Sequence, residues 1–248
     1  MSNILLIHGA WGGAWELEAI AHQLSEGPHR ARAIDLPGHG ANPSHPEDIT
    51  MDAYVNHVVE EVRSTEGPVI LAGHSLAGAV ISRVAELLPE KIESLVYICA
   101  ILPRDGESTL SLMESDSDGQ LLPRIVFSED QSTATVGVET LEEVFLHDIE
   151  HGPERQRLAE KLRVAQAVQP FLATAELSES RFGAIPKFYI RCSLDRILSP
   201  ALQDRMIEGW NVERVFELEA GHLPILSMPE QVAHAIGSAV LAEVAVPS

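Results

Sequence analysis

The sequence predicts an α/β domain built around a parallel, three-layered sheet. Continuous apolar runs of strand length, such as residues 4–7 and 69–72, are typical of parallel strands that helices cover on both faces. Segments with helical spacing of apolar residues alternate with these runs, as in βαβ units. At 248 residues, the chain is long enough for one such domain with a large core.

The first hundred residues alternate between the two kinds of segment. Apolar residues recur at helical spacing in residues 51–64 and again in 76–88, where Pro89 ends the pattern. Turns that contain glycine or proline separate most of the segments. The expected strands are residues 4–7, 30–34, 68–72 and 94–100, and the expected helices are residues 14–25, 51–64 and 76–88.

Residues 103–182 interrupt this rhythm. Their first part, 111–120, is acidic and loop-like, whereas 141–177 has helical patterns, and no strong strand is expected. We expect a helical cap over the carboxyl edge of the sheet, where an open α/β sheet has its binding crevice. The α/β core would then consist of residues 1–102 and 183–248, completed by strands at 187–191 and 212–218 and helices at 200–208 and 229–244.

Composition indicates a globular chain and excludes some partners. Hydrophobic residues make up 45% and charged residues 22%, and the formal net charge is -20, which repels phosphate backbones and anionic membranes. We therefore expect no nucleic-acid or membrane partner. No signal-peptide pattern or bilayer-length apolar run is found, so we expect a cytoplasmic protein with reduced Cys99 and Cys192. A homodimer stays open.

The clearest candidate for chemistry is Ser75, between an expected strand and an expected helix. In Gly73-His74-Ser75-Leu76-Ala77-Gly78, the glycines allow a tight turn that projects the serine hydroxyl into solvent. Such a turn is a nucleophile elbow, and the helix macrodipole favours negative charge that develops there. Ala77 occupies the position of the usual last glycine, and its single methyl group is small enough to fit.

A serine hydroxyl needs a base, and the base needs a carboxylate on its second ring nitrogen. His222 follows the last expected strand and would lie at the same carboxyl edge as Ser75. Asp195 follows the expected strand 187–191 at that edge, which gives the chain order Ser, Asp, His. Asp105, just after another strand, is a less favoured alternative for the carboxylate.

The oxyanion of acyl transfer needs backbone amide donors. The amide of Leu76 follows the candidate nucleophile, and the amide of Ala10 lies in the glycine-rich turn after the first strand. That turn lacks the glycine spacing and the Lys-Ser/Thr pair of a phosphate-binding loop. His147 and His151 could share one helix face, but we expect a solvated pair and no metal, because no further ligands accompany them.

Several motifs together resemble one branch of the α/β-hydrolases. They are His8-Gly9-Ala10-Trp11-Gly12, Asp35-Leu36-Pro37-Gly38-His39-Gly40, the elbow at 73–78, the Asp195 loop and Gly221-His222. The branch contains plant methylesterases, hydroxynitrile lyases and bacterial esterase relatives, and the resemblance spans nearly the whole chain except the middle insertion. It implies the α/β-hydrolase fold with about six parallel strands.

The resemblance also bears on the reaction. Cyanohydrin-cleaving members of the branch have a lysine after the catalytic histidine and a threonine in the oxyanion loop, whereas this chain has Leu223 and Ala10. It therefore implies hydrolysis of a small carboxylic ester through an acyl-enzyme, without a cofactor. A hydroxynitrile lyase, another enzyme that uses His222 only as a base, and a non-catalytic ligand receptor remain alternatives. The candidate substrate-binding residues are Trp11, Leu121, Leu122, Phe127, Phe145, Phe171, Leu172 and Leu223.

Overall fold

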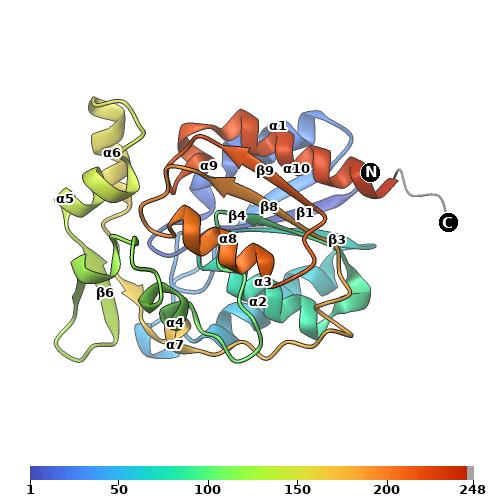
Figure 1. Cartoon of the computed structure of the whole chain (residues 1–248), viewed down its shortest axis with the longest axis horizontal. Coiled ribbons are helices and arrows are strands. Elements are labelled where there is room, and N and C mark those ends of the chain that lie inside the picture. The colour runs from blue at the N-terminus through green and yellow to red at the C-terminus, as the bar shows by residue number, and fades with distance from the viewer. Residues whose placement is uncertain (245–248) are drawn as a thin grey trace.

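The main sheet contains six parallel strands in the order β2-β1-β3-β4-β8-β9. It is seen in the computed structural model, which describes residues 1–244 (Figure 1). The parallel sheet and the strand number expected from the sequence are confirmed. The strands are β1 (Asn3–Ile7), β2 (Arg30–Ile34), β3 (Val69–His74), β4 (Ile92–Ile98), β8 (Lys187–Cys192) and β9 (Arg214–Leu218).

Burial explains why the central strands have such simple sequences. Every residue of β3 is buried, as are all but one residue of β1, β4 and β8, because helices cover both faces of the sheet. The outer strands β2 and β9 are partly exposed and include charged residues such as Arg30 and Glu217. The apolar runs thus mark the middle of the sheet, where the core lies.

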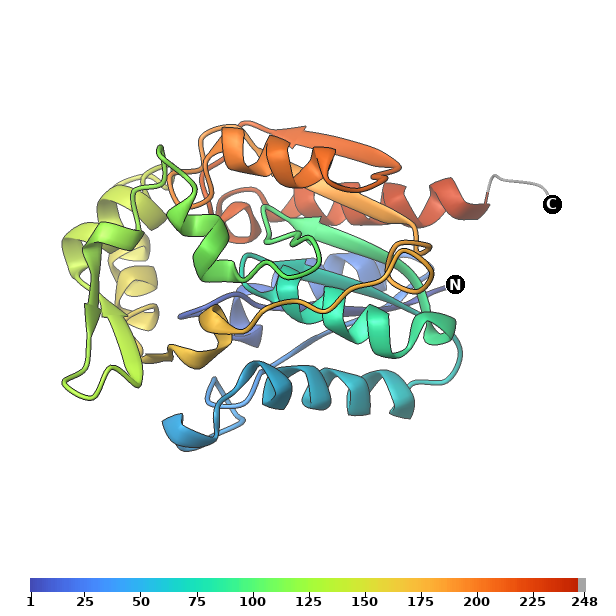
Figure 2. The ribbon, with the colours of Figure 1, turned by 60° about the horizontal axis from the view of Figure 1, so that its bottom comes forward.

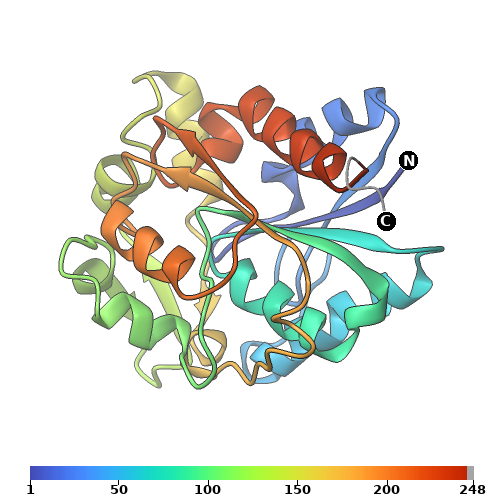
Figure 3. The same ribbon diagram turned by 45° about the vertical axis from the view of Figure 1, so that its right-hand side comes forward.

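Helices form the two outer layers (Figure 3). On one face, α1 (Glu18–Glu26) packs against α10 (Pro229–Val244). On the other face lie α2 (Met51–Ser64), α3 (Ala77–Leu87) and α8 (Pro200–Glu208). Short 3-10 turns at Ala14–Glu16, Pro46–Asp48 and Pro89–Lys91, and the short helix α9 (Pro224–Ser227), complete the core.

The segment 103–182 contains a small sheet that the sequence analysis did not predict. Strands β5 (Ile125–Phe127), β6 (Thr133–Val136) and β7 (Gln166–Ala167) form an antiparallel sheet in the order β5-β6-β7. The sequence led us to expect no strong strand in this segment, and these three short strands correct the interpretation of the segment as purely helical. These strands have only two to four residues, too few for a visible alternation of apolar and polar positions.

Helices make up the rest of this segment. They are α4 (Thr109–Glu114), the 3-10 turn Leu122–Arg124, α5 (Val138–Thr140), which continues into a π-helical turn at Leu141–Phe145, α6 (Pro153–Lys161) and α7 (Gln169–Leu172). Helix α4 corrects the expectation of a loop for residues 111–114, whereas residues 115–120 form turns and irregular structure, as expected. Its start is a capping box in which Ser108 and Ser111 exchange hydrogen bonds at 2.9 and 3.0 Å. Serine replaces the usual Glu or Gln in this box, so the sequence signal is weak.

Most of the segment lies at the end of the main sheet to which the strand arrows point, whereas the chain after α7 runs back along the molecule to the start of β8 (Figure 2). The segment therefore covers the carboxyl edge, as expected, while its limits at 103 and 182 stay a prediction. Among the described residues, no helix is both long and apolar enough to cross a membrane.

Candidate active site

Ser75 lies in a tight turn between β3 and α3. Its φ of 54° is in the left-handed region, which a non-glycine residue adopts only at a cost. The Ser75 carbonyl accepts hydrogen bonds from the amides of Gly78 and Ile101, both at 3.0 Å, and these bonds stabilise the turn. A Cβ at Gly9 would lie 2.8 Å from the Cβ of Ser75, so a glycine is needed where the loop after β1 approaches. This is the geometry of a nucleophile elbow.

The side chains of Ser75, His222 and Asp195 form one chain of hydrogen bonds. Oγ of Ser75 lies 2.8 Å from Nε2 of His222, and Nδ1 of His222 lies 2.7 Å from Oδ2 of Asp195. The other carboxylate oxygen accepts from the amides of Ile197 and Leu198 at 2.8 and 3.1 Å. His222 and Asp195 are both buried. A carboxylate at Nδ1 keeps the ring proton there, so Nε2 can accept the proton of the serine hydroxyl.

The other candidates from the sequence lie in different surroundings. Oδ1 of Asp105 accepts the amide of Leu177 at 2.9 Å, so this carboxylate belongs to a loop contact and not to the histidine. Nε2 of His151 lies 3.3 Å from the guanidinium of Arg155, whereas Nε2 of His147 is buried without a partner among the described residues. Of the two carboxylates considered, Asp195 is therefore the one that the fold brings to His222.

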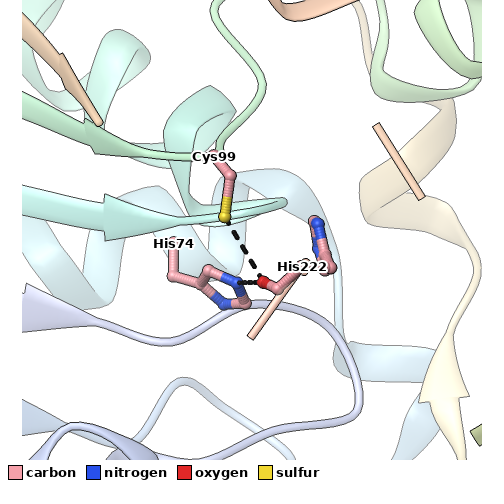
Figure 4. Close-up of side chains that lie close together, drawn as sticks. All are labelled: His74, Cys99 and His222. Carbon is pink, nitrogen blue, oxygen red and sulfur yellow. Dashed lines mark hydrogen bonds between the residues drawn. The ribbon is translucent and has the colours of Figure 1, made fainter. Parts of the chain in front are cut away.

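Two more side chains contact the backbone of His222 (Figure 4). Nε2 of His74 donates to the carbonyl oxygen of His222 at 2.7 Å, and the Cys99 thiol donates to the same oxygen at 3.3 Å. Burial, together with the neighbouring His222, lowers the pKa of His74 to about 3. The ring is therefore neutral, with its one proton on Nε2. Burial likewise raises the pKa of the Cys99 thiol, which keeps its proton and remains a donor.

These three residues also bring potential metal-ligand atoms close together. Potential ligand atoms of His74, Cys99 and His222 lie within 4.8 Å of one another in the described part of the chain. However, Nε2 of His74, the thiol and both ring nitrogens of His222 already take part in hydrogen bonds. Although Nδ1 of His74 has no partner among the described residues, a metal ion shared with Cys99 and His222 would break the thiol bond and one ring bond of His222, so the donor atoms fit the hydrogen-bonded arrangement better.

Ala10 and Leu76 line the same cavity as Ser75. Within the described residues, neither backbone amide donates to a protein acceptor. The loop that contains Ala10 is fixed by Trp11, whose amide donates to Oε1 of Gln166 at 3.2 Å and whose indole donates to the carbonyl of Ala134 at 3.0 Å. Two amides beside the serine are thus available for an oxyanion.

A buried network of hydrogen bonds supports the loop that contains Ala10. The sequence analysis did not predict this network. The Gln166 amide donates to the hydroxyl of Tyr54 at 3.1 Å, and His39 contacts both that hydroxyl and the carbonyl of Gly12, at 3.1 and 3.0 Å. The buried Glu16 accepts the amide of Gly13 at 3.0 Å. His39 lies in the conspicuous motif at 35–40, which was a signal, but nothing in the sequence singles out Gln166.

This geometry agrees with what similar proteins show. Residues 4–235 match the model of a family described as the alpha/beta hydrolase family. The chain belongs to the alpha/beta hydrolase family. It is 31% identical over 245 residues to the pyrethroid hydrolase of Sphingobium wenxiniae, a match that covers 95% of this chain and 86% of that protein. It is 28% identical to Methylesterase 9 of Arabidopsis thaliana, over 93% of this chain and 95% of that protein.

Solved structures of other alpha/beta hydrolases have the same fold. The crystal structure of a pyrethroid hydrolase from Sphingobium faniae has a TM-score of 0.82 at 28% identity, and the match covers 96% of each chain. Polyneuridine aldehyde esterase has a TM-score of 0.83 over 96% of this chain and 98% of that one, and at 24% identity this likeness concerns the fold alone. The branch resemblance inferred from the sequence motifs is confirmed.

In this alpha/beta hydrolase, the cavity at Ser75 is small. Its volume is about 20 Å³, and five of the predicted substrate-binding residues line it: Trp11, Leu121, Phe145, Phe171 and Leu223. Phe127, Leu122 and Leu172 lie instead on a neighbouring cavity of about 390 Å³, where Phe127 and Leu172 are each 51% exposed. Trp11, Met113 and Phe171 line both cavities.

Several lining residues of the hydrolase were not anticipated. Thr109 and Met113 come from α4, which overlaps the start of the stretch expected to be loop-like, and Ile197 and Leu198 lie two and three residues after Asp195. The position of Ile197 and Leu198 beside the candidate acid was a usable signal. Thr109 and Met113 had none, because only the path of the chain over the sheet edge brings them near Ser75.

Proposed function

We propose that this protein is a serine hydrolase that cleaves a small carboxylic ester through an acyl-enzyme intermediate. The observation that carries the proposal is the chain of hydrogen bonds from Ser75 through His222 to Asp195, at 2.8 and 2.7 Å. A hydroxyl, an imidazole and a buried carboxylate in this order are the parts that acyl transfer needs. The similarity to a pyrethroid hydrolase and to a methylesterase supports ester cleavage.

In the first half of the proposed reaction, Nε2 of His222 takes the proton of Ser75 while Oγ attacks the ester carbonyl. The amides of Ala10 and Leu76 bind the oxyanion that forms. When the intermediate collapses, the ester C–O bond breaks and the alcohol leaves with the proton from His222. The acyl group remains on Oγ.

In the second half, a water molecule loses a proton to His222 and attacks the acyl carbonyl. The bond to Oγ then breaks, the carboxylic acid leaves, and Ser75 regains its proton from His222. Asp195 stabilises the imidazolium in both halves and keeps the ring oriented. No step of this proposed reaction calls for a cofactor.

The proposal is tested by labelling with a fluorophosphonate, which reacts with an activated serine. We expect one adduct per chain, mapped to Ser75 by mass spectrometry, and no adduct in Ser75→Ala or His222→Ala. His22→Ala is the matched control, because its side chain is 76% exposed on α1, and it should label like the parent protein. An adduct that persists in folded Ser75→Ala, or no labelling of the parent protein, would contradict the proposal.

A further inference from the structure

The larger cavity next to Ser75 has no role in the reaction described so far. It has a volume of about 390 Å³, and its own lining residues are mostly apolar and come from the segment 103–182. They include Leu110, Leu122, Ile125, Phe127, Val168 and Leu172. Gln131 is the one polar residue of its lining among the described residues, and no ionised side chain takes part. Its chemistry therefore suits an uncharged, apolar group.

Volumes show why the reaction site needs this space. At about 20 Å³, the cavity at Ser75 has room for about one water molecule. Ligand sites in proteins usually measure roughly 300–1,000 Å³. The neighbouring cavity falls within that range, so the space for most of a substrate lies beyond the wall of the Ser75 cavity.

Trp11, Met113 and Phe171 form the wall between the two cavities. Trp11 is held in place, whereas the side chains of Met113 and Phe171 can adapt. Trp11 is fixed by its hydrogen bonds to Gln166 and Ala134, at 3.2 and 3.0 Å. Met113 is unbranched and has several rotatable bonds, and the ring of Phe171 lies against that of Trp11, with centroids 5.7 Å apart. A rotamer change of Met113 or Phe171 can join the two cavities without disturbing the loop that contains Ala10.

We infer that the larger cavity binds an extended apolar arm of the ester whose carbonyl lies at Ser75. The substrates would then be carboxylic esters with one small group and one long or bulky apolar group. This inference rests on the proposed ester cleavage and extends its substrates from small esters to esters with one larger apolar group. The arm belongs either to the acyl group or to the alcohol of the ester. In both cases it is an uncharged apolar group.

Two ester series with chains of two to twelve carbons test the inference, one lengthened in the acyl group of p-nitrophenyl esters and one in the alcohol of acetates. In the series that carries the arm, kcat/KM should rise at least tenfold with chain length. Val168→Trp narrows the larger cavity and should lower the ratio of kcat/KM for the long ester to that for p-nitrophenyl acetate at least fivefold. Val164→Trp is the matched control, because Val164 is exposed outside the cavity and should leave the ratio unchanged.

Different outcomes separate this inference from the proposed function. If the protein hydrolyses p-nitrophenyl acetate but kcat/KM does not rise with chain length in either series, the inference is overturned. The proposed function as a hydrolase would then still hold. An equal ratio in Val168→Trp and Val164→Trp would also overturn the inference. If Val168→Trp does not fold, Leu122→Trp is the second variant, since Leu122 lines the larger cavity alone. No turnover of any ester would contradict the proposed function and, with it, the inference.

A different observation supports a second inference, which concerns His74. Its Nε2–H bond to the carbonyl oxygen of His222, at 2.7 Å, joins the turn of the nucleophile to the loop of the base. Its Nδ1 is buried without a partner in the described structure. Burying this nitrogen without a hydrogen bond costs free energy that an apolar residue at this position would not lose. The geometry points to His74 as a positioning residue that fixes the backbone of His222 so that its ring lies in reach of Ser75.

Two amide substitutions provide a matched test of this role. The amide of Gln reaches the position of Nε2, whereas that of Asn reaches only the position of Nδ1. We expect His74→Gln to keep kcat within about threefold, and His74→Asn to lower it on the order of tenfold or more with little change in KM, because small displacements at a reacting centre are costly. His74→Leu, which fills the site without any donor, is the second variant if the Asn variant does not fold. Equal kcat in folded Gln and Asn or Leu variants would overturn the inference.

Discussion

Replacing Glu16 by Gln should change how the stability of this protein depends on pH. The Glu16 side chain is 3% exposed and lies under the loop that carries Ala10, where it accepts the amide of Gly13 at 3.0 Å. No basic side chain pairs with it among its described partners. Burial therefore raises the pKa of Glu16 from 4.5 to about 8, and the folded protein keeps this carboxyl protonated at neutral pH.

The size of the effect follows from proton linkage. Between pH 4.5 and about pH 8, Glu16 is ionised in the unfolded chain and protonated in the folded one. The folded state then binds one more proton, so the free energy of unfolding falls by about 1.4 kcal/mol for each pH unit. The contribution of Glu16 is most favourable below pH 4.5 and is lost as the pH rises toward 8. From pH 5 to pH 7 the loss amounts to about 3 kcal/mol.

A glutamine amide resembles the protonated carboxyl and does not titrate, so the Glu16→Gln variant should escape this loss. Urea unfolding at pH 5, 6 and 7 measures the free energy of unfolding of both proteins. The difference between them should grow by about 3 kcal/mol over this range in favour of the variant. Glu18→Gln, at an exposed position of α1, is the control and should show a constant difference. Parallel curves for Glu16→Gln and the parent protein would refute the reasoning.

Three further substitutions have defined outcomes. Asp195→Asn should lower kcat on the order of ten-thousand-fold in an assay with p-nitrophenyl acetate, because the His222 tautomer is lost, and near-normal turnover would reject that role. Gly78→Ala should destabilise the fold by about 3 kcal/mol in urea unfolding, because the new Cβ would lie 2.1 Å from a backbone oxygen, whereas Gly137→Ala meets nothing within 4 Å. Lys187→Met should lower the free energy of unfolding by about 3 kcal/mol, because three carbonyl oxygens lose their donor, and an unchanged midpoint would contradict this account.

The sequence was sufficient for the fold because buried parallel strands leave a simple pattern. Residues 4–7 and 69–72 are continuous apolar runs, and they lie in β1 and β3 at the centre of the sheet. The outer strands were recognisable from the rhythm of the neighbouring helices, although their own residues are partly exposed. The candidate site was predictable to the same extent, because each of its residues lies in the loop or turn that follows a strand.

The cap and the buried polar groups were less predictable, for different physical reasons. Strands β5 to β7 are too short to show a period, and their antiparallel pairing depends on tertiary contacts. The partners of His74 and Trp11 are distant in sequence: His74 bonds to a residue 148 positions away, and Trp11 to one 155 positions away. A sequence pattern describes neighbours along one element and does not contain such pairs.

Under the proposed function, the fold separates the residues of the reaction from those that select the substrate. Loops after β1, β3, β8 and β9 carry Ala10, Ser75, Asp195 and His222, and these strands lie within one parallel sheet whose carboxyl ends meet at one edge. Two of the three residues in the wall between the cavities, Met113 and Phe171, come instead from the short helices α4 and α7 of the insertion. Changes in these helices can therefore alter which apolar group fits while the distances among the serine, histidine and aspartate stay fixed by the sheet. This separation is why a weaker preference for long chains, and not the loss of all activity, is the expected result of narrowing the larger cavity.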